Sequence, residues 1–194
     1  MSKRIALFSA AAFGALALTA AVIAPVSAQD KMTKSEMSGE KTVMVGGAAM
    51  FPSKNIIQNA VHSKDHTTLV AAVKAAGLVE TLEGKGPFTV FAPTNTAFGK
   101  LPAGTVDTLV KPENKATLTK ILTYHVVPGK LEASSLTDGK KLKTVEGEEL
   151  TVKKSGDTVM LVDAKGGSST VTIANVNQSN GVIHVVDTVL MPAS

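Results

Sequence analysis

Apolar residues in the first half of the domain recur at helical spacing. The range 69–76 (LVAAVKAA) puts its apolar side chains on one face, and Gly77 follows as the expected left-handed end of that helix. Ser53 is a typical N-cap for an earlier helix, and Pro112 suits the first turn of a later, longer one. The same spacing predicts helices or helical turns over residues 53–61, 69–76, 79–82, 94–98, 103–110 and 112–122.

Alternation of apolar and polar residues replaces this spacing in the second half. Gly156-Asp157 is a turn signal, and Asn180-Gly181 is the best hairpin signal because both residues tolerate the positive φ of a type I′ turn. Helices followed by strands, without regular β-α-β alternation, predict an α+β domain with a mostly antiparallel sheet. Strands are expected over residues 88–92, 124–127, 150–152, 158–162, 169–174 and 182–191.

The first 28 residues have the pattern of a cleavable signal peptide. A basic start precedes an apolar run that ends in small residues, so cleavage is expected between Ala28 and Gln29. An uncleaved membrane anchor is the alternative, since the apolar run approaches the roughly 20 residues that span a bilayer. We expect residues 29–52 to be a polar linker and residues 53–194 to be the folded domain.

Composition narrows the classes of partner. Arg4 is the only arginine, and it lies in the expected signal peptide, so every cation of the mature chain is a lysine. Removing residues 1–28, with Lys3 and Arg4 and no acid, lowers the net charge from +4 to +2. A nearly neutral chain with one tyrosine, no tryptophan and no mature arginine lacks the groups that read or stack on bases. The absence of cysteine excludes disulfides, thiol nucleophiles and cysteine-ligated clusters.

Three segments, in this order, resemble fasciclin (FAS1) domains. Phe88–Asn95 (FTVFAPTN), followed by Ala97-Phe98, is similar to the first signature box of that family. Tyr124-His125 is similar to its central Tyr-His pair, and Gly181–Asp187 (GVIHVVD) is similar to its second box. The resemblance covers about residues 53–192.

This resemblance implies a fold and a type of function. The implied fold is α+β: a fasciclin-like wedge of mostly antiparallel β-sheet with an N-terminal helical layer. The implied roles are extracellular adhesion and matrix or cell-wall association, by binding and without a shared set of catalytic residues. A single domain copy departs from the multi-domain adhesins of the family, and it removes bridging through several domains of one chain.

Four histidines are the main candidates for chemistry. His62 and His66 have the spacing of two metal ligands on one helix face. Ser63, Asp65 and Thr67 predict a helix break there, and a catalytic zinc needs three protein ligands. We therefore expect two solvated polar side chains, with no metal and no cofactor.

The other two histidines, His125 and His184, lie in apolar segments that we predict to be strands. His184 there must find hydrogen-bond partners, because an unpaired buried polar group costs roughly 1–3 kcal/mol. Within the two boxes of the resemblance, Thr94, Asn95 and Asp187 are suitable partners. We therefore interpret Thr94, Asn95, His184 and Asp187 as a structural network that joins the boxes, and we assign no catalytic residue.

Tyr124 and His125 leave two interpretations open. The pair resembles the integrin-contact motif proposed for animal fasciclin proteins, which would make it a partner contact. Its neighbours are branched aliphatic residues, however, and an aromatic residue in such a segment is usually core. We favour the core interpretation.

Together, residues and resemblance predict a secreted, non-catalytic module for adhesion or for cell-envelope or matrix interaction. The expected partner is a cell-surface or matrix protein or polysaccharide, and self-association stays open. We expect no nucleic acid, a membrane only through the signal peptide, and a secreted or periplasmic, cell-envelope location. The alternative is a carrier of a small molecule or lipid, or an unrecognised hydrolase. It would need a pocket of several hundred Å³ between helices and sheet.

Overall fold

The computed structural model describes residues 41–193. The expected signal peptide, and residues 29–40 of the expected linker, lie outside the described residues. Within residues 41–193, the helices and 3-10 turns are α1 (Ile56–Ala60), η1 (Lys64–His66), α2 (Thr67–Ala76), α3 (Val79–Glu83), α4 (Asn95–Gly99), α5 (Thr105–Leu109), η2 (Pro112–Asn114), α6 (Lys115–Tyr124) and η3 (Ala133–Ser135). The strands are β1 (Val43–Val45), β2 (Ala48–Met50), β3 (Phe88–Pro93), β4 (Val126–Pro128), β5 (Lys141–Lys143), β6 (Glu149–Ser155), β7 (Thr158–Val162), β8 (Ser168–Gln178) and β9 (Gly181–Val186).

The main sheet has the strand order β4-β3-β9-β8-β7-β6-β5. All its neighbouring strands are antiparallel except β3 and β9, which pair in parallel with Phe91 opposite His184. The two signature-like boxes are therefore adjacent strands of one sheet. The expected α+β class, with a mostly antiparallel sheet and an N-terminal helical layer, is confirmed.

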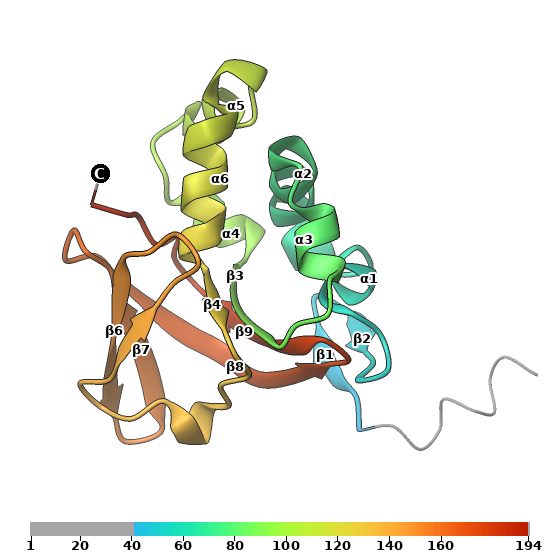
Figure 1. The fold of residues 1–194 in the computed structure, drawn as a ribbon, viewed down its shortest axis with the longest axis vertical. Coiled ribbons are helices and arrows are strands. Elements are labelled where there is room, and N and C mark those ends of the chain that lie inside the picture. Colours follow the sequence, from blue (N-terminus) through green and yellow to red (C-terminus); the bar gives the residue numbers. More distant parts are fainter. Residues whose placement is uncertain (1–40, 194) are drawn as a thin grey trace, which may run out of the picture. The chain divides into compact units, whose positions relative to one another are not determined.

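The sheet curls until its two edges approach each other. The N–H of Val145, just after β5, donates to the carbonyl of Val126 in β4 at 2.8 Å. Residues inside this curl form a buried cluster that includes Phe91, Tyr124 and Leu161. A second apolar cluster lies between the helices and β3 and β9. In Figure 1 the helices stand together on one side, and β6 and β7 turn away from them.

A hairpin at residues 43–50 corrects the expected linker. β1 and β2 pair with Val45 opposite Ala48, and Gly46-Gly47 between them both have positive φ. Val45 and Met50 are buried in the cluster under the helices. The folded domain therefore begins before residue 53, because two short apolar runs, VMV and AAM, flank a Gly-Gly turn, which is a hairpin pattern.

Three local predictions shift by one or more residues. Asn55, not Ser53, caps α1. Tyr124 is the last residue of α6 rather than the first of a strand, so the strand β4 starts at Val126. The β8–β9 hairpin exists, but its turn is Ser179-Asn180 and Gly181 already pairs with Gln178. The predicted end of α2 at Gly77 is confirmed, with the N–H of Leu78 donating back to Val73.

Candidate functional site

Tyr124 is enclosed by the curled sheet. Its side chain has no exposed surface, and it packs in the cluster that includes Phe91 and Leu161. The hydroxyl accepts a hydrogen bond from the N–H of Ala164 at 3.0 Å and donates to the carbonyl of Glu149 at 3.4 Å. Burial raises the pKa of Tyr124. In the folded domain the hydroxyl of Tyr124 links the start of β6 to the turn after β7, and the side chain offers a partner no surface.

His125 links the end of α6 to the segment that follows β9. Nδ1 lies 2.8 Å from the carbonyl of Ile121, and Nε2 lies 3.0 Å from the N–H of Leu190. Because a carbonyl only accepts and an N–H only donates, the ring is neutral with its proton on Nδ1. Burial lowers the pKa of His125 to about 4, against smaller opposing effects of the Ile121 carbonyl and Asp163. The structure thus contradicts a direct partner contact by Tyr124-His125.

His184 performs the same task in the opposite tautomer. Nε2 donates to the carbonyl of Leu131 at 2.7 Å, and Nδ1 accepts from the N–H of Asn175 at 3.4 Å. The ring stacks on Phe91 of the parallel neighbour strand, with 5.6 Å between ring centroids. Burial lowers the pKa of His184, while the Leu131 carbonyl and Glu132 oppose this. Its partners are backbone groups, so the predicted bonds to Thr94, Asn95 and Asp187 are wrong.

Asn95 caps a helix that lies far from it in sequence. Its Oδ1 accepts from the N–H of Thr68 at 3.0 Å, and its Nδ2 donates to the carbonyl of Lys64 at 2.8 Å. His66, the residue before α2, makes no side-chain cap. Asn95 therefore supplies the acceptor that the first turn of α2 lacks, and it joins the first box to the helical layer rather than to the second box.

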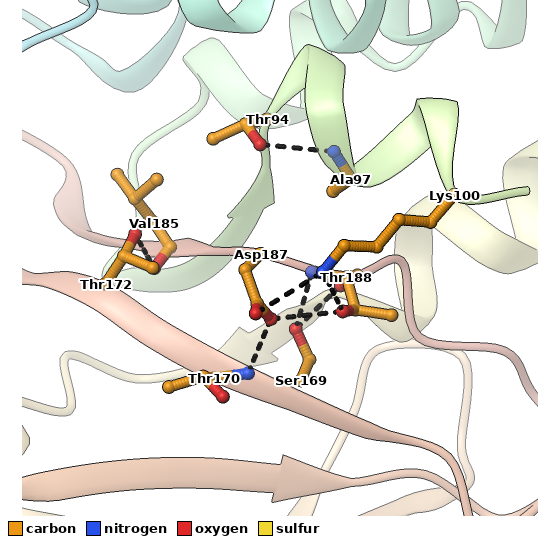
Figure 2. Close-up of polar contacts among 9 residues, drawn as sticks. All are labelled: Thr94, Ala97, Lys100, Ser169, Thr170, Thr172, Val185, Asp187 and Thr188. Carbon is orange, nitrogen blue, oxygen red and sulfur yellow. Dashed lines mark hydrogen bonds and ion pairs between the residues drawn. The ribbon is translucent and has the colours of Figure 1, made fainter.

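Thr94 and Asp187 also act separately, as Figure 2 shows. Thr94 caps α4 by accepting from the N–H of Ala97 at 3.2 Å. Asp187 accepts from the N–H of Thr170 at 2.8 Å and pairs with Lys100 at 3.4 Å. Burial acts to raise the pKa of Asp187, but these contacts and the hydroxyl of Thr188 outweigh it and lower the pKa. The four predicted network residues therefore each contact different groups, and they do not form one network.

His66 differs from the expectation of a solvated side chain. It is buried, with Nδ1 2.9 Å from the hydroxyl of Ser63, whereas His62 is exposed. Its buried Nε2 makes no hydrogen bond of normal geometry within the described residues. His66 is one of the residues that line an apolar cavity of about 40 Å³ between helices and sheet. Burial lowers the pKa of His66, and the Ala92 carbonyl and Asp65 oppose this.

Residues 41–193 contain no group of three or more His, Cys, Asp or Glu side chains placed to hold a metal ion. In that range, none of the helices combines the length and the apolar composition needed to cross a bilayer.

A polar surface groove of about 560 Å³ is the feature that sequence reasoning missed. It lies between the start of α1, the segment after α3 and the turn between β8 and β9. A capping-box pattern, Asn55 followed three residues later by Gln58, was the available signal for one wall. The polar side chains that line the groove are Asn55, Gln58, Glu83, Lys85, Lys130, Gln178, Ser179 and Asn180.

The parallel pair of boxes, the curled sheet and the helical layer define a FAS1 fold. The solved structure of a FAS1 domain pair from the insect cell adhesion molecule Fasciclin I matches it with a TM-score of 0.64 at 17% identity, over 73% of this chain and 52% of that one. The Fasciclin domain model matches residues 64–192, and the chain belongs to this family.

Two relatives align over most of both chains. The protein sll1483 of Synechocystis sp. is 51% identical over 153 residues, which are 79% of this chain and 82% of the relative. The immunogenic protein MPB70 of Mycobacterium bovis is 35% identical over 199 residues, which cover 99% of this chain and 98% of the relative.

Proposed function

We propose that this protein is exported and acts, without catalysis, as a module that attaches to a cell-surface, envelope or matrix component. The observation that carries the proposal is the set of hydrogen bonds made by three of the buried titratable side chains. Tyr124, His125 and His184 each hold backbone segments together, and each has its polar atoms satisfied by main-chain groups. General acid–base catalysis requires such a group within hydrogen-bond reach of a substrate, and the polar atoms of these three side chains are already hydrogen-bonded to the main chain.

The carrier or hydrolase alternative receives less support. Small-molecule sites are pockets of roughly 300–1,000 Å³. The cavity between helices and sheet is about 40 Å³, enough for water but not for a lipid or a substrate beside His66. The helical layer therefore packs as core.

Attachment through a large apolar patch is also disfavoured. Among the described residues, the exposed large apolar side chains are Met44, Val61 and Val145, which belong to three different parts of the fold. A polar mode of contact fits this surface better. The partner we propose is a cell-surface or matrix protein or polysaccharide, not nucleic acid, with self-association as a further mode.

Export is the first part of the proposal to test. We expect the mature protein to begin at Gln29 and to be found outside the cytoplasm, in the medium, the periplasm or the envelope. Intact-mass measurement of protein from each fraction decides this. A measured mass that includes residues 1–28 would show that the protein stays anchored through this segment and is not released.

Binding is the second part. Folded 29–194 protein is incubated with isolated envelopes and matrix extracts, and retention is measured against concentration, with heat-denatured protein as the control. We expect saturable retention of the folded form alone. No retention above the control would refute the attachment function, and an apolar compound released by organic extraction of the purified protein would favour the carrier.

A further inference from the structure

The groove between α1, the segment after α3 and the β8–β9 turn has a rigid floor. Asn180 accepts a hydrogen bond from the N–H of Ile56 at 3.1 Å through Oδ1. Its Nδ2 donates to the carbonyls of Leu82 at 2.7 Å and Gly84 at 3.0 Å. One side chain thus fixes all three walls relative to one another. A site whose walls are fixed before binding loses little conformational entropy when a ligand arrives.

The capping box of α1 decides which polar atoms face the groove. Asn55 Oδ1 accepts from the N–H of Gln58 at 2.8 Å, and Gln58 Oε1 accepts from the N–H of Asn55 at 3.1 Å. Both side-chain oxygens are therefore held by the backbone. The two NH₂ groups make no hydrogen bond within residues 41–193, so they are the free ends of these side chains.

The other free side-chain groups of the groove are mainly donors as well. Lys85 has no ion pair within the described residues, and it is exposed. Lys130 meets Glu132 only at 3.8 Å, with both side chains nearly half exposed, so its ammonium group keeps donors for a ligand. Glu83 is the carboxylate in the lining. Two amides and two ammonium groups against one carboxylate make the groove rich in donors.

We propose that this groove binds a short segment of an acidic, uronate-type polysaccharide. Carboxylate and ring oxygens of such a chain accept hydrogen bonds, which complements the donor excess. The volume of about 560 Å³ is in the range of sites that enclose small ligands. The exposed Pro87 and the glycines beside it offer an apolar surface for the C–H face of a sugar ring. This inference rests on the proposed attachment function and names the chemistry of its partner.

Nuclear magnetic resonance can observe the proposed donors directly. Trigalacturonate is titrated into ¹⁵N-labelled 29–194 protein, and neutral maltotriose serves as the comparison. We expect the side-chain NH₂ signals of Asn55 and Gln58 and the backbone signals of residues 84–86 and 178–181 to shift with trigalacturonate alone. Equal shifts with maltotriose would refute the acidic class, and shifts spread over other surfaces would refute the groove.

Two isosteric substitutions separate recognition from folding. Asn55→Asp with Gln58→Glu keeps both capping oxygens and turns each free donor into an acceptor, so the fold should be retained. We expect the affinity for trigalacturonate to fall on the order of tenfold or more. The matched control, Lys143→Ala with Lys153→Ala, makes the same two-unit change in net charge on exposed positions outside the groove, and it should bind like wild type.

The outcomes also distinguish this inference from the attachment function. An unchanged affinity in the Asn55/Gln58 variant, or an equal loss in the lysine control, would overturn the groove assignment. Wild-type protein that is retained by envelopes but does not bind trigalacturonate would overturn the inference and leave attachment standing. Wild-type protein that shows neither would refute both.

Discussion

Acidification should destabilise this domain through its buried histidines before any carboxylate with a shifted pKa is affected. The neutral ring of His125 donates at Nδ1 and accepts at Nε2, so a second proton would face the N–H of Leu190. The folded state therefore binds the proton less readily than the unfolded chain. The stability that depends on neutral His125 is fully present above pH 6.5 and is lost as the pH falls toward 4.

The magnitude follows from the two pKa values. A fall in the pKa of His125 from 6.5 to about 4 corresponds to about 3 kcal/mol of unfolding free energy. About 2 kcal/mol of this is lost between pH 7 and pH 5. His66 and His184 act in the same direction because burial lowers their pKa values too. The pKa of Asp187 is lowered below 3.8, so this carboxylate stays charged between pH 7 and pH 5.

Urea unfolding at pH 7, 6 and 5 measures this dependence. His125→Gln retains one donor and one acceptor but cannot be protonated, so its unfolding free energy should change by about 2 kcal/mol less than that of wild type over the window. The absolute stability of the variant at pH 7 does not enter, because only the pH dependence is compared. His62→Gln, at an exposed position, is the matched control and should follow wild type. Identical pH dependence in wild type and His125→Gln would refute the reasoning.

Three further predictions concern packing and caps. Asn95→Ala should lower the unfolding free energy by about 1–2 kcal/mol, measured by urea titration, because the first turn of α2 loses its acceptor; unchanged stability would show that the cap is dispensable. Tyr124→Phe should stay folded and lose about 1–3 kcal/mol of unfolding free energy, because two backbone groups lose their hydrogen-bond partner. Tyr124→Ala should lose about 3–5 kcal/mol, because it also removes the buried ring. Equal losses of stability in thermal unfolding would contradict a packing role. Gly181→Ala should destabilise the domain strongly, because a Cβ there would overlap the carbonyl of Phe88. Gly99→Ala is the control and should be tolerated, because its Cβ would meet open space. Equal expression and melting temperature of the two variants would refute the close approach of Gly181 to Phe88.

The helical layer could be predicted from apolar spacing and end signals alone. α2 ends at Gly77 as expected, and the two boxes become β3 and β9 as expected. Of the strand predicted over residues 124–127, Val126 and Val127 lie in β4, but Tyr124 and His125 belong to the end of α6. The prediction started the strand too early because aromatic and β-branched residues favour strands locally. Helix α6 ends at Tyr124, two residues beyond the predicted end at residue 122, and Tyr124 packs inside the curled sheet.

The α+β class, the family resemblance, the lack of cysteine and the lack of arginine beyond Arg4 depend only on residue types and their spacing, so the amino-acid pattern suffices to predict them. The contacts of the histidines, in contrast, depend on the tertiary structure. His125 and His184 bond to main-chain groups of Ile121, Leu190, Leu131 and Asn175, and every residue type has such groups, so no side-chain pattern could point to them. The polar groove was hidden for a related reason: its walls are brought together from positions up to about 125 residues apart, and only the folded chain joins them.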